Sequence, residues 1–121
     1  MAKRQSPTSR TLAAIRKLGG IAGVVEKRVP GMPHITQDLF GFIDIVCLLG
    51  PNIIGIQATD STNHSHRRDK ILAEPRALAW LKAGGLIEIW SWSMTGARGE
   101  RKLWTARKEE IVLTDFLKEH P

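Results

Sequence analysis

Cysteine is almost absent from this chain of 121 residues, which has only Cys47 and therefore no internal disulfide. Cys47 lies in an apolar run, so we expect a buried, inert thiol rather than a reactive one. The CxxC and HExxH spacings of zinc sites are also missing, and His64 and His66 would point in different directions on a helix. We therefore expect no zinc site.

Long apolar segments are absent as well. The longest apolar run, FGFIDIVCLLG, is interrupted by Asp44 and is too short to cross a bilayer. The N-terminal residues are basic and polar, without an apolar signal region behind them. We therefore expect an intracellular, cytoplasmic protein with no membrane partner. The length suits a flexible basic arm over residues 1–8 followed by one domain over residues 9–121.

Positive charge is in excess and is clustered. The chain has 18 Lys and Arg against 12 Asp and Glu, for a formal net charge of +6. Acids are scarce before Pro30, where Glu26 stands alone among basic residues. The clusters comprise Lys3, Arg4, Arg10, Arg16, Lys17, Lys27 and Arg28, then Arg67, Arg68 and Lys70, then Arg98, Arg101, Lys102, Arg107 and Lys108. This pattern favours a nucleic-acid partner, the alternative being a solvated surface that keeps the protein soluble.

The hydrophobic pattern predicts the element order α-β-β-β-α-β-β-α. Tight turns are expected at Gly50-Pro51-Asn52 and between the last two strands, and GMPHITQ is expected to be a loop. Pro75 predicts a helix break at Glu74 and a new helix from its own position. The predicted helices cover residues 10–18, 64–73, 75–85 and 113–120, and the strands 21–30, 40–50, 53–59, 86–92 and 101–111. We expect an α/β fold with a mixed central β-sheet flanked by helices.

Two polar residues interrupt apolar strands and are candidates for a site. Asp44 lies between Ile43 and Ile45, where a carboxylate is costly unless it is paired or binds a metal. Gln57 ends the apolar run that follows the tight turn, so it should lie near Asp44 at one end of an antiparallel pair. The alternatives are that Asp44 faces solvent and that Gln57 only satisfies backbone groups.

The stretch GFIDIVCLLGPNIIGIQAT resembles the core of the PD-(D/E)xK, or restriction-endonuclease-like, nuclease superfamily. That core has an acid on its second strand, a hairpin, and an apolar strand ending in (D/E)-x-K. Asp44 matches the first acid, whereas Gln57 and Thr59 take the positions of the second acid and the lysine. The predicted order α-β-β-β-α-β also matches, nearest to the Holliday-junction resolvase and VRR-type branches. The resemblance covers roughly Thr11 to Trp92.

The resemblance implies a DNA endonuclease that uses Mg²⁺ or Mn²⁺ to hydrolyse phosphodiester bonds, with branched DNA as a candidate substrate and a homodimer as the working form. It implies metal ligation by Asp44, Gln57 and Asp38, with carbonyl 58 as a further contributor. Glu26 is the nearest substitute for an acid that many relatives carry on the first helix. The implied catalytic residues are Asp44, Gln57, Thr59 and Glu26. The small size suits a phage or mobile-element protein.

Thr59 cannot supply the positive charge of the motif lysine. Lys27, His64, Arg67 or Lys70 would then reach the site from a neighbouring element. The residues expected to contact nucleic acid are Lys27, Arg28, His64, Arg67, Arg68, Lys70, Arg98, Arg101 and Lys102. The helix that carries His64 and Arg68 has a second interpretation, a solvated amphipathic helix.

Three functional classes remain open on the sequence alone. The first is the nuclease, and the second is a catalytically inactive nucleic-acid-binding or regulatory protein on the same fold. The third is a protein-interaction domain whose clustered charge is incidental. The tryptophans of the last two strands also have two alternative roles. They either stack on unpaired bases or pack against a helix layer or a dimer partner; the residues are Trp90, Trp92 and Trp104.

Overall fold

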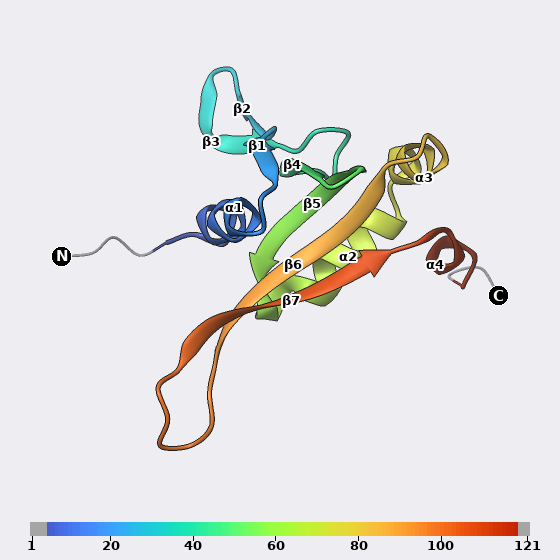
Figure 1. The fold of residues 1–121 in the computed structure, drawn as a ribbon. Coiled ribbons are helices and arrows are strands. Elements are labelled where there is room, and N and C mark those ends of the chain that lie inside the picture. Colours follow the sequence, from blue (N-terminus) through green and yellow to red (C-terminus); the bar gives the residue numbers. More distant parts are fainter. Residues whose placement is uncertain (1–4, 119–121) are drawn as a thin grey trace.

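A five-stranded mixed sheet forms the centre of the computed structural model, which describes residues 5–118 (Figure 1). The middle strand is buried from Ile54 to Thr59, as its nearly continuous apolar sequence predicts. It pairs in parallel with the strand that begins at Leu86, and the other pairs in the sheet are antiparallel. In sheet order the strands are β1 (Ile21–Val24), β4 (Ile45–Leu49), β5 (Asn52–Asp60), β6 (Leu86–Thr95) and β7 (Leu103–Ile111).

Helices cover both faces of the sheet, which confirms the expected mixed α/β class. On one face Ile15 packs in a core cluster with Trp90 and Trp92, and on the other Ile71 and Ala77 pack with isoleucines of β6. Among the described residues, no helix is both long enough and apolar enough to pass through a bilayer. The helices are α1 (Pro7–Lys17), then the short η1 (Ser61–Asn63), α2 (His64–Leu72), α3 (Pro75–Lys82) and α4 (Leu113–Lys118).

A second, two-stranded sheet was not expected from the sequence. β2 (Lys27–Val29) and β3 (Met32–Gln37) form a hairpin outside the main sheet. The single strand predicted over residues 21–30 is therefore two strands, and the loop predicted at GMPHITQ is mostly strand. The hairpin is largely exposed, so its sequence lacks the alternation that burying one face of a strand would impose.

The element boundaries also differ in places from those predicted. α1 begins at Pro7, capped by the Ser6 side chain, so residues 7 and 8 belong to a helix rather than to the expected arm. Residues 1–4 of that arm and His120 of the last helix lie outside the described residues. α3 begins at Pro75 as predicted, because Glu74 has the extended backbone that a following proline favours.

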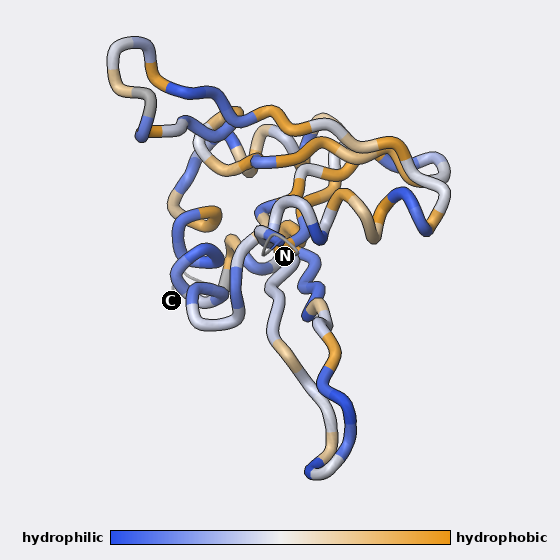
Figure 2. Tube along the Cα trace, turned by 90° about the vertical axis from the view of Figure 1, so that its left-hand side faces the viewer, coloured by the Kyte–Doolittle hydropathy of each residue, from blue (hydrophilic) through white to orange (hydrophobic). Residues whose placement is uncertain are grey.

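β6 and β7 form a long arm that projects from the body of the molecule (Figure 1). Their pairing runs without a break from Ile87 opposite Ile111 to Thr95 opposite Leu103. Figure 2 shows the strands of the body coloured as hydrophobic and the far end of the arm as hydrophilic. Trp90 and Trp92 lie on the same side, as predicted, with ring centroids 6.5 Å apart. The arm therefore combines an apolar base with a polar tip.

Candidate metal centre and nucleic-acid interface

Asp44 and Gln57 meet where β4 begins and β5 approaches its end. The two-residue turn at Gly50 and Pro51 fixes the register, so that the Asp44 N–H donates to the Ile56 carbonyl at 3.0 Å. Gln57 Nε2 donates to Asp44 Oδ2 at 2.6 Å, and the Ala58 N–H donates to the same oxygen at 3.0 Å. The proximity expected from the sequence is confirmed.

Asp38 is brought back towards Asp44 by a tight turn. Phe40 and Gly41 both have positive φ, at 53° and 79°, as the two central residues of a type I′ turn require. The Phe42 N–H donates to the Leu39 carbonyl at 3.2 Å and closes the turn. A Cβ at position 41 would also meet the end of the Glu74 side chain, which can shift, so the positive φ is what favours glycine here.

Three carboxylates converge at this point. Glu26 lies just before β2 and Asp38 just after β3, so both stand at the base of the small hairpin, above Asp44. One oxygen from each of the three lies within 4.8 Å of the other two. Lys70 reaches in from α2, and its Nζ is 2.8 Å from Asp38 Oδ2.

These groups line a polar cavity of about 250 Å³. Gln57 and Arg67 both line this cavity, and Gln57 Oε1 and Arg67 Nε are buried without a hydrogen-bond partner among residues 5–118. Buried polar atoms in folded proteins are nearly always satisfied, so both atoms are candidates for contact with a ligand of the cavity. The cavity is lined by Thr8, Glu26, Thr36, Asp38, Asp44, Gln57, Ala58, Arg67 and Lys70.

The pKa values of the two aspartates shift in opposite directions. Burial, followed by the hydrogen bonding and charge of Asp38, raises the pKa of Asp44 to about 7. Burial also acts to raise the pKa of Asp38, but hydrogen bonding with Asp44 and the adjacent Lys70 outweigh it, and that pKa is lowered. Without a cation the pair therefore holds a proton at Asp44 near neutral pH, and a cation would compete with that proton.

The set of ligands fits a hard divalent cation. Mg²⁺ and Mn²⁺ prefer oxygen ligands, and this cavity offers three carboxylates and an unpartnered amide oxygen. Lys70, whose Nζ lies 2.8 Å from Asp38 Oδ2, adds a positive charge beside these carboxylates. Arg67 and Lys70 are three residues apart on α2, and this spacing is the one signal in the sequence that could have paired them.

Thr59, His64 and Arg68 are expected site residues that do not line the cavity. Thr59 is buried and is not among the residues that line it. His64 is also buried: its Nδ1 lies 2.7 Å from Ser91 Oγ, and its Nε2 lies 2.7 Å from Glu109 Oε1. Arg68 Nε donates to Glu109 Oε2 at 2.9 Å. Both ring nitrogens of His64 are therefore engaged inside the protein, and the phosphate contact expected of it stays a prediction.

The network around His64 holds α2 against β6 and β7. Burial acts to raise the pKa of Glu109, but hydrogen bonds from His64 and Arg68 outweigh it and lower that pKa. Arg68 also donates to Asp115 at 3.3 Å, which ties in α4. The helix that carries Arg67 and Lys70 is thus positioned by a polar network on its own buried side.

We expect His64→Ala to lower the free energy of unfolding by about 3 kcal/mol, because it removes a buried ring and takes away the partner of Ser91 Oγ and of Glu109 Oε1. His66 lies on the same helix but is exposed, so His66→Ala is the matched control and should change the value by less than about 0.5 kcal/mol. Urea unfolding of both variants measures the difference. Equal losses would show that the network contributes nothing specific.

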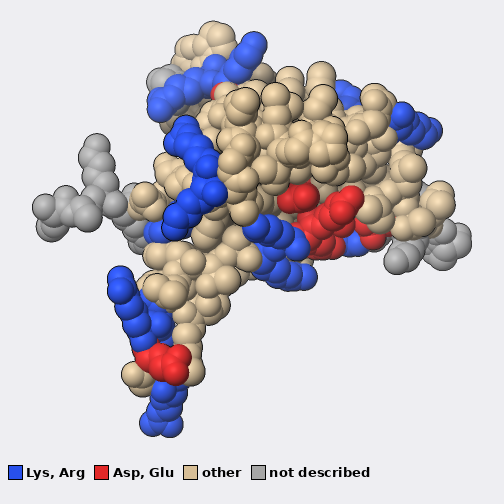
Figure 3. All heavy atoms as spheres, viewed as in Figure 1, with Lys and Arg blue, Asp and Glu red and all other residues tan. Residues whose placement is uncertain are grey.

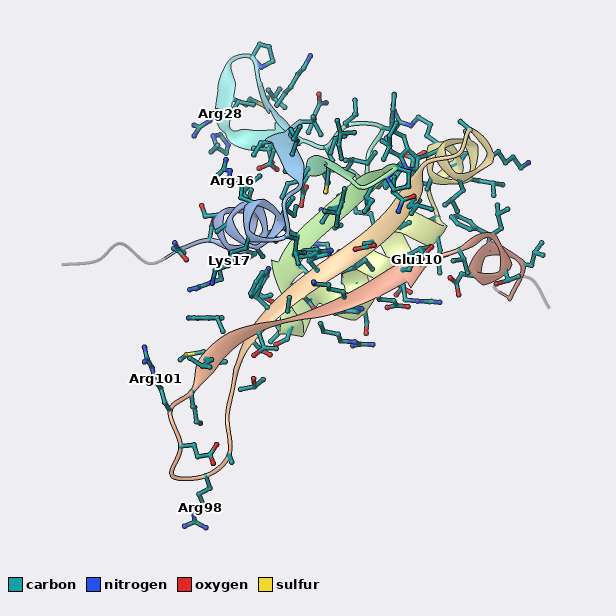
Figure 4. The ribbon with its side chains drawn as sticks, viewed as in Figure 1. Arg16, Lys17, Arg28, Arg98, Arg101 and Glu110 are labelled. Atoms are coloured by element: carbon teal, nitrogen blue, oxygen red, sulfur yellow. The ribbon has the colours of Figure 1, made fainter. Side chains whose placement is uncertain are left out.

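The other basic candidates lie on the outside of the molecule. Lys27, Arg28, Arg98, Arg101 and Lys102 are all exposed. Figure 3 shows Lys and Arg side chains gathered along one side of the molecule and at the tip of the arm. In Figure 4 that side runs from Arg28 on β2, past Arg16 and Lys17 on α1, to Arg101 and Arg98 near the tip. The name basic edge is used below for the five residues labelled on that side in Figure 4, which are Arg16, Lys17, Arg28, Arg98 and Arg101.

Comparison of the chain with models of protein families, with curated proteins and with solved structures finds no match.

Proposed function

We propose that this protein is a divalent-metal-dependent DNA endonuclease with a restriction-endonuclease-like fold. The observation that carries the proposal is the cavity in which Glu26, Asp38 and Asp44 converge beside Lys70 and the unpartnered oxygen of Gln57. The topology supports it: if the small hairpin is treated as an insertion, α1, β1, β4, β5, α2 and β6 follow the order α-β-β-β-α-β.

The metal would be held by Asp44, Asp38 and Glu26, with Gln57 Oε1 as a neutral ligand. A bound Mg²⁺ would supply Lewis acidity towards a phosphate oxygen and lower the pKa of bound water. Asp44 is oriented for ligation, because Gln57 and the Ala58 N–H hold one of its oxygens at 2.6 and 3.0 Å. Lys70 holds a positive charge next to Asp38, where it offsets the negative charge that develops on a reacting phosphate.

The basic edge would bind the DNA backbone outside the cavity. Arg98 and Arg101, on the arm, and Arg28, on the small hairpin, are well separated along one side, as contacts to phosphates spread along a DNA backbone require (Figure 4). Such contacts carry little sequence information and fix the orientation of the substrate. We therefore propose that the substrate is selected by structure rather than by base sequence.

One observation favours a second candidate, a nucleic-acid-binding protein that does not cut. Gln57 Nε2 and Lys70 Nζ already donate to Asp44 and Asp38, so part of the negative charge is compensated without any metal. Binding that falls steeply with salt, with no cleavage in any metal, would support this candidate.

The test is cleavage of labelled linear duplex, single-stranded, flapped and four-way-junction DNA with Mg²⁺, Mn²⁺ or EDTA. We expect cutting that requires metal. Glu26→Gln should lower the rate at limiting Mg²⁺ by at least about 10-fold, the loss typical when groups that support a metal are removed. Glu100→Gln removes the same charge from an exposed position near the tip of the arm and should leave the rate unchanged. Cutting that persists in EDTA, or responds equally to both variants, would refute the proposal.

A further inference from the structure

A second cavity, of about 300 Å³, lies between the start of α1 and the base of the arm. It is lined by Trp92, Trp104, Arg10 and Asp60 together with residues 5–7. We call it the tryptophan pocket. A volume of this size is at the lower end of the range for pockets that take small planar molecules.

The tryptophan pocket combines one fixed and one exposed indole. Trp92 is almost fully buried, and its Nε1 donates to Thr11 Oγ1 at 2.9 Å, which holds the ring in place. Trp104 is 38% exposed, and the Arg10 guanidinium lies 3.8 Å from its ring centroid. Because the guanidinium already covers one face of Trp104, a flat aromatic group that enters this pocket would stack on the Arg10–Trp104 pair or take the place of Arg10 on the indole, next to Trp92.

The tryptophan pocket lies next to the acidic cavity described above. Thr8 and Ala58 line the acidic cavity, whereas Pro7 and Asp60 line the tryptophan pocket. Two residues of a strand span about 6.6 Å, so the linings of the two cavities approach each other near the end of β5 and at the first turn of α1. A strand of nucleic acid that passes the acidic cavity can therefore place a nearby nucleotide at the tryptophan pocket.

The charges around the tryptophan pocket suit a nucleotide. Arg10 is the cation inside it, and the exposed Arg101 and Lys102 lie further along the arm. Asp60 is the acid on its rim; its Oδ1 already accepts from Thr62 and Asn63, and its second oxygen can accept from the amino group of a base. A phosphate is therefore favoured on the side of Arg10, and a base edge on the side of Asp60.

We propose that the tryptophan pocket binds an unpaired base of a DNA strand whose backbone passes the acidic cavity. The identity of the occupant rests on the proposed function. A base within a duplex cannot present its face to Trp104, so the preferred substrate has an unpaired nucleotide next to the cleavage position, as a flap or a junction does. The tryptophan pocket is thus what distinguishes the substrate from ordinary duplex DNA.

The test measures binding in EDTA, where no cleavage occurs, with a labelled single strand and with the same strand as a duplex. Trp104→Ala should weaken binding of the single strand about 10-fold and leave duplex binding nearly unchanged. Trp104→Phe should retain most of the affinity. Leu103→Ala is the matched control, because Leu103 is the exposed neighbour on the opposite face of β7 and should affect neither substrate.

A second measurement needs no variant. The indole fluorescence of the wild-type protein should be quenched by the single strand and not by an abasic strand of equal length. No quenching, or equal weakening of single-strand and duplex binding in Trp104→Ala, would overturn the inference. Metal-dependent cleavage is measured separately. If cleavage is absent while binding of the single strand still depends on Trp104, the proposed nuclease function is contradicted and the base-binding pocket is supported.

Discussion

Asp44→Asn is expected to abolish metal-dependent cleavage, with a loss on the order of 10³-fold in the single-turnover rate. The amide keeps an oxygen that can accept from Gln57 and from the Ala58 N–H, so the local hydrogen bonds survive. What is lost is the charge that a metal needs at the centre of the acidic cluster. Asp69→Asn is the matched control, because Asp69 is exposed on α2 and should leave the rate unchanged.

The same substitution should stabilise the metal-free protein, which would show that the lost activity is not lost folding. The pKa of Asp44 is about 7 in the folded protein and about 4 in the unfolded chain. A raised folded pKa contributes stability below about pH 4, and this contribution is lost as the pH rises through about 7. Near pH 8 the wild type therefore bears the full cost of ionising Asp44, and Asp44→Asn does not.

We expect the free energy of unfolding of Asp44→Asn to exceed that of the wild type by ~2 kcal/mol near pH 8, because the variant avoids the penalty of ionising Asp44. The gain is smaller than that full penalty, since the lowered pKa of Asp38 offsets part of it. The difference should shrink towards pH 4. Urea unfolding in EDTA across this range measures it. A variant that is less stable than the wild type at pH 8 would contradict the view that Asp44 is a carboxylate held for a cation.

Lys70→Met should separate cleavage from metal binding. We expect the cleavage rate to fall about 100-fold, because Lys70 is the cation of the cavity that is placed against an acid of the site. Metal affinity should hold or increase, since the substitution removes a positive charge that pairs with Asp38 at 2.8 Å. Calorimetry with Mn²⁺ and single-turnover cleavage measure the two quantities.

Lys82→Met is the matched control for Lys70→Met, because Lys82 is exposed on α3 and should change neither quantity. A parallel loss of metal affinity and cleavage in Lys70→Met would show that Lys70 only holds Asp38 in place. Retained cleavage would show that the charge of Lys70 is not needed, or that Arg67, which lines the same cavity, supplies it.

The pairing of Asp44 with Gln57 was predictable because a local turn determines it. A two-residue turn between adjacent strands allows only one register, so the hydrophobic pattern of β4 and β5 was enough to place both polar residues at one end of the sheet. Their participation in a single cavity follows from that register. The parallel pairing of β5 with β6, which are joined through α2 and α3, fits the same pattern, since helices are the usual connection between parallel strands.

The remaining members of the cavity depend on packing that no local pattern encodes. Glu26 and Asp38 meet only because β2 and β3 pair outside the main sheet, and that hairpin has little apolar signal. Lys70 reaches Asp38 only because α2 is rotated with Ile71 inwards, a direction fixed partly by the buried contacts of His64. The polar sequence around His64 fitted a phosphate site equally well, because a satisfied buried histidine and a surface ligand look alike in a single sequence.

The small hairpin has a consequence for how this protein can vary. Both of its acids stand at its base, and its tip at residues 30 and 31 is exposed. The length and composition of the tip are therefore uncoupled from the geometry of the three carboxylates. A chain of this kind can acquire a longer or shorter hairpin, or carry an inserted recognition segment there, while its chemical centre stays as it is. Specificity and chemistry can then diversify independently on one small scaffold.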